Sequence, residues 1–522
     1  MSDYFKKHTL VTGALLLTAA GFLSRILGFF YRIFLSRVIG AEGLGIYQMI
    51  FPVYGICLSL CAGSIQTAVS RHTAAHPKQA NRALLAGFSI SFPLSLLLAA
   101  FLIRGADLIA EKILLHPECA GLIPIFGLAI PFSSVHACIC GWFYGKEKVR
   151  IPAAAQLAEQ LIRITAVFFF AGVCQKNNIP VTVHLAAAGL LLGEAGSALL
   201  LLLIWLAGFK KADKKAAPSK RPAPVPGKTR TSSLASLQSA LLVLALPLMA
   251  NRLVLNFLQS AEAVLIPARL SVFGLSDSQA VSLYGILTGM AMPFVLFPSA
   301  VVNSLAVLLL PPIARHQSSG DLSGIRRNLA VAFRYSLYMG ILCVGIFSAF
   351  GRRLGTEVFK EPQAGSFIMV LAWLCPFLYL ATTAGSVLNG LGKTHVTFLH
   401  NLASLLLRLS FIYWGIPRYG IQALLWGMLA GELLLAFLHL RSLSRALSFS
   451  PDVWESVVKP VFCLAVSLCT GRLFPERLPL LPEGSAFFQT AGHIGIICIS
   501  YGLLLLFFHR KRAPYSSNST VT

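Results

Sequence analysis

Two apolar stretches of this chain align without a gap, LLLTAAGFLSRILGFFYR (Leu15–Arg32) and LVLALPLMANRLVLNFLQ (Leu242–Gln259). The alignment places Arg25 opposite Arg252, each inside a run of residues that is otherwise apolar. A chain that repeats such a stretch at a long interval is expected to repeat the helices around it as well. The sequence therefore predicts two copies of one helical unit.

A second match supports the repeat. Residues 141–164 align with residues 387–409, anchored on Gly145-Lys146 in the first copy and on Gly392-Lys393 in the second. Each copy then holds six apolar runs. Because six is an even number, both copies have the same orientation, as in parallel repeats related by an axis along the membrane normal.

The composition excludes a water-soluble protein. Of 522 residues, 56% are hydrophobic and only 12% are charged, and the mean hydropathy is +0.74, whereas soluble domains carry roughly 25% charged residues. A helix that crosses a bilayer needs about 20 mostly apolar residues. The sequence predicts an all-α polytopic membrane protein with about fourteen transmembrane helices, at 9–31, 46–69, 83–103, 121–143, 154–174, 184–208, 237–258, 281–305, 329–350, 365–389, 396–415, 420–440, 456–474 and 488–508.

The runs group into lobes. We expect an N-terminal six-helix lobe at 1–208, a basic linker at 209–236 and a C-terminal six-helix lobe at 237–440. The two lobes form a pseudo-twofold repeat, and residues 441–522 add two further helices and a basic tail. Repeats of this kind are typical of transporters that bind their substrate between the halves and alternate access to it.

The positive charges predict the orientation. The chain has 43 Lys and Arg against 19 Asp and Glu, a formal net charge of +24. Most of these cations fall in alternate connections, including the basic stretch Lys210–Arg230, and positive loops face the cytoplasm. We therefore expect both termini to be cytoplasmic. No aromatic residue is interleaved with the basic linker, so nucleic acid is not the expected partner.

A few arginines lie inside predicted spans. Six such charges at the bilayer centre would together cost roughly 15–20 kcal/mol, so several must face water, a partner or the interface. The repeat singles out Arg25 and Arg252, and Arg32 follows Arg25 by seven residues on the same helix face. Arginine in excess over acid indicates a cationic cavity, for which phosphate or diphosphate is the best match. The six are Arg25, Arg32, Arg163, Arg252, Arg334 and Arg408.

Acidic residues inside the spans are scarcer. Glu159 precedes Arg163 by four residues, the favourable order for an ion pair within one helix. Glu194 and Glu432 have no neighbouring cation in sequence and are candidate ion-coupling residues, for H⁺, Na⁺ or the membrane potential. A satisfied contact between helices is the alternative for both. No HExxH and no pair of CxxC motifs occurs, so neither a metal site, a cofactor nor a catalytic residue is predicted.

Several stretches resemble a known family. SRILGFFYRIFLSRVIGAEGLGIYQMIFPVY (Ser24–Tyr54), NRLVLNFLQSAEAVLIPARL (Asn251–Leu270) and SVLNGLGKT (Ser386–Thr394) are similar to the stage V sporulation protein B group of polysaccharide transporters. That group belongs to the superfamily of MurJ lipid II flippases, O-antigen flippases and MATE drug exporters. The resemblance implies a MATE/MurJ-like fold of six plus six plus two helices over essentially the whole chain.

The resemblance also implies a function. It predicts a bacterial plasma-membrane flippase for an undecaprenyl-diphosphate-linked saccharide, such as a peptidoglycan precursor for cell wall or spore cortex. Arg25 and Arg32 match two arginines of the MurJ first-helix motif that point into a cationic cavity. The acidic residue that MurJ carries after this helix falls near Ile46 here, and the arginine of the MurJ second span is absent. Arg252 is a candidate from the repeat alone.

We therefore expect a non-enzymatic flippase that binds a polyprenyl-diphosphate-linked saccharide through Arg25, Arg32 and Arg252. Its other expected partners are membrane lipids and cell-wall or spore-cortex synthesis proteins. One alternative is a cation-coupled exporter of small molecules or drugs, in which Glu194 or Glu432 controls transport. A second alternative is a non-transporting factor in spore-envelope assembly. A membrane-embedded glycan-modifying enzyme is disfavoured, because the outer loops carry no cluster of His or carboxylates.

Overall fold

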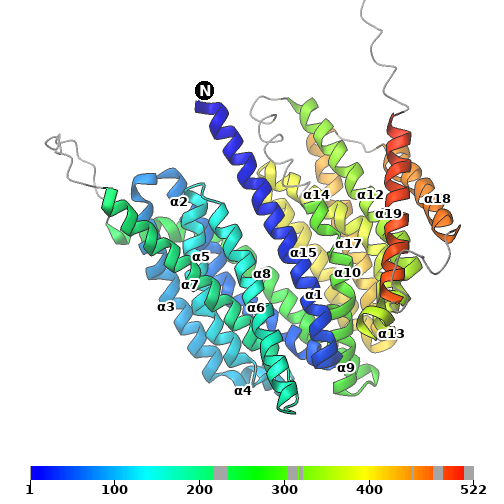
Figure 1. The fold of residues 1–522 in the computed structure, drawn as a ribbon, viewed down its shortest axis with the longest axis horizontal. Coiled ribbons are helices and arrows are strands. Elements are labelled where there is room, and N and C mark those ends of the chain that lie inside the picture. The colour runs from blue at the N-terminus through cyan, green and yellow to red at the C-terminus, as the bar shows by residue number, and fades with distance from the viewer. Residues whose placement is uncertain are drawn as a thin grey trace, which may run out of the picture. The chain divides into compact units, whose positions relative to one another are not determined.

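The computed structural model describes residues 2–215, 233–303, 316, 321–448, 452–473 and 486–510 (Figure 1). Every regular element within these ranges is helical. Most of the predicted linker and the whole basic tail after residue 510 lie outside them. The first part of the predicted linker is described and is helical, because the preceding helix continues to Lys215.

The described chain separates into two compact units. The first comprises Met1–Ala268 with Ser276–Ser282, and the second comprises Arg269–Leu275 with Leu283–Thr522. The helices of the first unit, up to the crossing between the units, are α1 (Ser2–Leu58), η1 (Ser59–Gly63), α2 (Ser64–Ala75), η2 (Pro77–Gln79), α3 (Ala80–Arg104), α4 (Ala106–Leu108), η3 (Ile109–Ile113), η4 (Pro117–Cys119), α5 (Ile123–Gly145), α6 (Arg150–Lys176), α7 (His184–Lys215), α8 (Leu234–Phe273) and α9 (Asp277–Gly285).

The second unit is also a helical bundle. Its helices are η5 (Ile286–Ala291), α10 (Met292–Leu296), α12 (Leu322–Leu354), η6 (Gly355–Phe359), α13 (Pro362–Leu371), η7 (Ala372–Leu374), α14 (Cys375–Gly390), α15 (Thr394–Ser410), η8 (Phe411–Gly415), α16 (Ile416–Tyr419), α17 (Ile421–Leu447), η9 (Trp454–Val458), α18 (Lys459–Leu473) and α19 (Ala486–Arg510).

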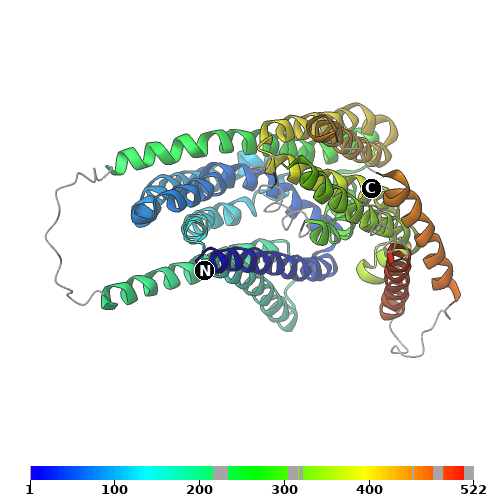
Figure 2. The same ribbon diagram turned by 90° about the horizontal axis from the view of Figure 1, so that it is seen from above.

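The first unit includes α8, although the repeat assigns this helix to the C-terminal lobe. Leu237 and Leu241 of α8 are buried in one apolar cluster with Leu84 of α3. Gln238 of α8 also donates a hydrogen bond of 2.8 Å to the hydroxyl of Ser89 of α3, and the two helices run side by side in Figure 2. Packing thus groups α8 with the N-terminal helices, while the lobes at 1–208 and 237–440 stay a prediction about internal symmetry.

The count of fourteen spans is approximate. Among the described residues, twelve helical stretches are long and apolar enough to cross a membrane. Two predicted spans, 9–31 and 46–69, fall in the single stretch Leu16–Ala75, since the helix resumes at once after a break at Gly40. The predicted span 456–474 is divided between η9 and α18, and α18 has only 15 residues.

Glycines make the turn that joins the first two predicted spans. Gly40 has φ 71° and ψ −176°, a conformation that side chains with a Cβ rarely adopt. Gly45 follows it, and a Cβ there would collide with the carbonyl of Val281 in α9. The chain can therefore reverse here and still pack closely on α9.

π-Helices recur at matching places in the two copies of the repeat. η1 lies in the second predicted span and η5 in the eighth, and the sequence offset between Ser59 and Ile286 is the one that relates Arg25 to Arg252. η3 and η6 likewise follow the third and ninth spans. Since π-helical turns are rare and often functional, their recurrence supports a structural repeat.

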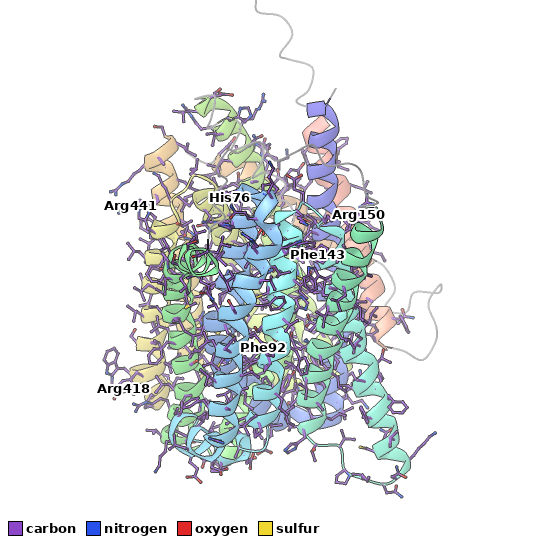
Figure 3. The ribbon with its side chains drawn as sticks, turned by 90° about the vertical axis from the view of Figure 1, so that its left-hand side faces the viewer. His76, Phe92, Phe143, Arg150, Arg418 and Arg441 are labelled. Atoms are coloured by element: carbon purple, nitrogen blue, oxygen red, sulfur yellow. The ribbon has the colours of Figure 1, made fainter. Side chains whose placement is uncertain are left out.

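Loops predicted to lie on the same side of the membrane lie at the same end of the first unit. His76 and Arg150, from two loops predicted to be cytoplasmic, lie at the same end of the first unit, with Phe92 near the middle (Figure 3). In the second unit, Arg418 and Arg441 lie at opposite ends (Figure 3). Alternate loops therefore lie at one end of each bundle, as a multi-pass protein requires.

Candidate functional site

Arg252 of α8 lies against the π-helix η1. Its guanidinium fills the place into which a side chain at Gly63 would project, so the glycine makes room for it. The side chain of Arg252 is exposed, and no described residue forms an ion pair with it. An arginine within an apolar helix therefore presents its charge on the surface of the first unit.

Asn256 holds this part of α8 in place. Its side-chain amide donates hydrogen bonds to the carbonyl of Gly55 at 3.1 Å and to the hydroxyl of Ser59 at 2.6 Å. A π-helical turn lacks the regular i to i−4 bonds, which leaves backbone groups open to such contacts. Because Asn256 follows Arg252 by four residues, both lie on the face of α8 that meets η1.

Arg25 and Arg32 lie on α1 of the same unit. Arg25 is exposed and Arg32 is partly buried. The structure thus places all three predicted substrate-binding arginines in the first unit, with different surroundings. Their role in binding stays a prediction.

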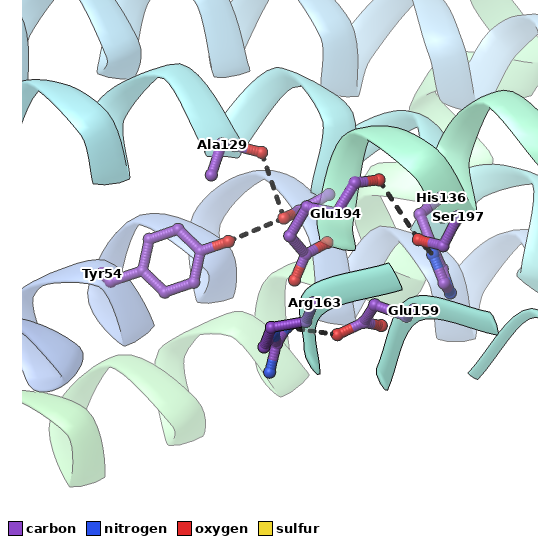
Figure 4. A network of polar contacts seen from close by, with 8 residues as sticks. Tyr54, Ala129, His136, Glu159, Arg163, Glu194 and Ser197 are labelled. Atoms are coloured by element: carbon purple, nitrogen blue, oxygen red, sulfur yellow. Dashed lines mark hydrogen bonds and ion pairs between the residues drawn. The ribbon is translucent and has the colours of Figure 1, made fainter. Parts of the chain in front are cut away.

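A buried polar network lies deeper in the first unit (Figure 4). The hydroxyl groups of Tyr54 and Ser133 are 2.7 Å apart, and Ser133 donates to the carbonyl of Ala129 at 3.2 Å. His136 Nδ1 and the hydroxyl of Ser197 are 2.8 Å apart. The residues come from α1, α5 and α7, so one polar interior joins three helices.

Arg163 and Glu159 of α6 complete the network. Arg163 Nη2 donates to Glu159 Oε1 at 2.5 Å, and the two side chains are only 14% and 17% exposed. The ion pair predicted from the spacing of these residues is therefore confirmed. Figure 4 shows the pair facing Glu194 of α7.

Glu194 makes this network a candidate cation site. One ligand atom from each of His136, Glu159 and Glu194 lies within 4.8 Å of the other two. With both carboxylates ionised and His136 neutral, Arg163 balances only one of two negative charges. A proton or a small cation would neutralise the rest, as membrane-embedded carboxylates generally require.

Sequence reasoning found only part of this cluster. Glu194 and the Glu159–Arg163 pair were visible as charges in apolar runs. His136 and Tyr54 were not singled out, because a lone polar residue in an apolar helix is ordinary until the fold brings several together. No metal site was predicted, since the three candidate ligands come from α5, α6 and α7 and form no local motif.

The other candidate, Glu432, lies in the second unit, partly buried on α17. A Cβ at the preceding residue, Gly431, would come within 2.9 Å of the Arg408 methylenes. The carbonyl of Gly431 accepts a hydrogen bond of 2.9 Å from Ser404. Among the described residues, only the first unit gathers three or more potential metal ligands.

Comparison with known proteins gives consistent results. The family model described as polysaccharide biosynthesis protein matches residues 10–317. Stage V sporulation protein B of Bacillus subtilis (strain 168) is 27% identical over 519 residues, covering 96% of each chain. The lipid II flippase MurJ of the same organism is 23% identical, over 74% of this chain and 73% of the flippase.

Solved structures show the same fold. A lipid II flippase MurJ in an inward closed conformation superposes with a TM-score of 0.69 at 15% identity, covering 95% of this chain and 99% of that one. An inward-facing multidrug resistance MATE transporter gives a TM-score of 0.63 at 11% identity, covering 83% and 98%. The MATE/MurJ-like helical fold predicted from the sequence is therefore confirmed. These structural neighbours are a flippase and a transporter, the class of function expected from the sequence.

Proposed function

The chain belongs to the polysaccharide biosynthesis protein family, and from that premise we propose that it is a flippase for an undecaprenyl-diphosphate-linked saccharide. The saccharide unit would cross the bacterial plasma membrane by alternating access, without covalent chemistry. The names of two relatives, a lipid II flippase and a stage V sporulation protein, support a cell-wall or spore-cortex precursor as the cargo. Partners in those syntheses belong to the same proposal.

The observation that carries this proposal is the exposed Arg252 over Gly63. A guanidinium binds a phosphate oxygen pair as a planar fork, so an unneutralised arginine on an apolar helix suits a diphosphate headgroup. Arg25 occupies the equivalent position on α1, and Arg32 adds a third charge on that helix. Together the three arginines would attract the anionic headgroup away from the membrane surface.

The carboxylate cluster of the first unit supplies the coupling ion site in this proposal. Glu194, with Glu159 and His136, would take up a proton or cation on one side of the membrane and release it on the other. Glu432 would then contribute to helix packing in the second unit and would not couple transport to an ion. Cytoplasmic termini remain part of the proposal, supported by the distribution of Lys and Arg.

The test of function is complementation. A strain depleted of its lipid II flippase should regain growth when it expresses this chain, and Arg252→Ala should lose that ability while Arg441→Ala, at the end of α17, keeps it. Failure of the wild-type chain to restore growth, although it is present in the membrane, would exclude a lipid II cargo.

The cation-coupled exporter is the second candidate, favoured by the same carboxylate cluster and by the fold shared with multidrug transporters. It predicts resistance to toxic cationic compounds in a susceptible host, lost in Glu194→Gln and retained in Arg252→Ala. If the chain is a flippase, neither the wild-type protein nor Arg252→Ala should confer such resistance.

A further inference from the structure

A crevice opens between α12 and α19 in the second unit. It has a volume of about 400 Å³, within the roughly 300–1,000 Å³ of small-molecule sites. Aliphatic side chains form most of its wall, and one arginine and three tyrosines are the polar groups. The residues used below are Arg334, Tyr335, Tyr338, Met339, Leu342 and Tyr501.

Arg334 is the charge in this crevice. Its Nε is buried and has no hydrogen-bond partner, and no described residue forms an ion pair with it. Glu455 of η9 forms an ion pair with Lys459 at 3.1 Å. A partly buried guanidinium whose Nε has no partner is costly, so a group from outside the chain is expected to meet it.

The position of Arg334 along α12 defines the depth of the site. Arg326 and Arg327 are exposed at the start of this helix, as cations at a membrane surface usually are. Arg334 lies two turns further on, about 10 Å deeper along the helix axis. The guanidinium of Arg334 is therefore deeper than Arg326 and Arg327 and lies beside the apolar walls of the crevice.

Tyrosines shape the crevice around this charge. The Tyr501 hydroxyl donates to the carbonyl of Tyr338 at 3.0 Å, which fastens α19 to α12. Tyr335 and Tyr338 pack edge to face with their ring centroids 6.0 Å apart, and Tyr335 remains 51% exposed. Tyrosine at such a place offers an apolar ring to a chain and a hydroxyl to a headgroup.

We propose that this crevice binds an anionic phospholipid of the surrounding bilayer, with its phosphate on Arg334 and an acyl chain along Met339 and Leu342, which lie further from the exposed start of α12. A soluble phosphate ion would satisfy the arginine but leave the aliphatic walls empty, whereas a neutral lipid would leave the charge unmatched. Such a lipid would contact both α12 and α19. It would hold α19, which lies outside the repeat, against α12. The proposal does not depend on which substrate the protein carries.

The test measures which lipids remain on the purified full-length protein. Protein extracted in mild detergent from membranes containing phosphatidylglycerol is analysed by native mass spectrometry. Wild type should retain phosphatidylglycerol, and Arg334→Gln should retain roughly tenfold less, since a charge-assisted phosphate contact is lost. Arg326→Gln, on the exposed start of the same helix, is the matched control and should retain the wild-type amount.

A second measurement guards against a variant that folds poorly. Arg334→Lys keeps the charge and should keep most of the lipid. Adding phosphatidylglycerol to delipidated protein should raise the Tm of wild type and Arg334→Lys, but not that of Arg334→Gln, and phosphatidylcholine should raise none. Equal retention by wild type and Arg334→Gln would overturn the proposal. So would equal stabilisation by phosphatidylcholine, or recovery of a polyprenyl phosphate in place of a phospholipid.

Discussion

The two units carry related sites that differ in charge. In the first, Gly193-Glu194 of α7 faces Arg163 of α6; in the second, Gly431 of α17, which precedes Glu432, packs on Arg408 of α15. Arg163 and Arg408 both sit near the end of the aligned segments 141–164 and 387–409, although the anchor on Gly145 and Gly392 places Ser410, two residues further on, opposite Arg163. Gly193 lets α7 approach α6 closely in the first unit, and Gly431 lets α17 approach α15 in the second.

The two sites differ in the residue that lies four positions before the arginine. In the first unit it is Glu159, which binds Arg163 and adds a second carboxylate. In the second it is Ser404, which donates to the carbonyl of Gly431 instead. The alignment anchored on Gly145 and Gly392 also places Thr383 opposite His136, and Thr383 bonds to Ser336 at 2.6 Å. At these two positions the first unit carries ionisable groups and the second carries uncharged hydroxyls, while both units keep an arginine and a glutamate.

The largest expected effect comes from removing the shared cation of the first site. Arg163→Gln leaves Glu159 and Glu194 close together without their arginine, and breaking such a buried pair costs about 3–5 kcal/mol. Unfolding of the purified protein in detergent should show this loss. The double variant Glu159→Gln with Arg163→Gln should recover most of it, and no recovery would show that Arg163 acts through packing alone.

Next comes the contrast between the two glutamates. Glu194→Gln should reduce ion-driven transport by about tenfold or more, a change of about 1.4 kcal/mol in the coupled step. Glu432→Gln should leave coupling within about twofold of wild type. Uptake into proteoliposomes with and without an imposed ion gradient separates coupling from simple binding. Equal losses in both variants would remove the functional distinction between the sites.

The two glycines should respond to the same substitution by different amounts. A Cβ at Gly193 would meet the Glu159 carbonyl at 3.0 Å, which is fixed backbone, and Arg163 Cβ at 3.1 Å. At Gly431 it would meet the flexible methylenes of Arg408. We expect Gly193→Ala to cost about 2–3 kcal/mol and Gly431→Ala about 1 kcal/mol. A reversed order in thermal unfolding would mean that α15 and α17 are the more rigidly packed pair.

The smallest effect is expected at Ser404. Ser404→Ala removes its hydrogen bond to Gly431 and should lower stability by about 1 kcal/mol, with transport unchanged. A transport defect at wild-type stability would show that the second site takes part in function after all.

Local patterns in the sequence predicted much of this arrangement. Helix positions follow from apolar runs, and the Glu159–Arg163 pair follows from a spacing of four residues. His136 could not be predicted, because its partners come from other helices. The packing of α8 against α3 and the crevice at Arg334 likewise depend on contacts between distant segments. The span count is approximate because the helix resumes directly after the break at Gly40, so that two predicted spans lie in one stretch.

The most direct measurement is headgroup translocation in proteoliposomes. A polyprenyl-diphosphate-linked saccharide with a fluorescent sugar is placed in both leaflets, and a membrane-impermeant quencher reports its movement. We expect translocation by the wild-type protein, strong loss in the double variant Arg25→Ala with Arg252→Ala, and wild-type activity in Arg418→Ala. Translocation at the wild-type rate by the double variant would contradict the assigned arginine site, and no translocation by correctly folded wild type would contradict the proposed function.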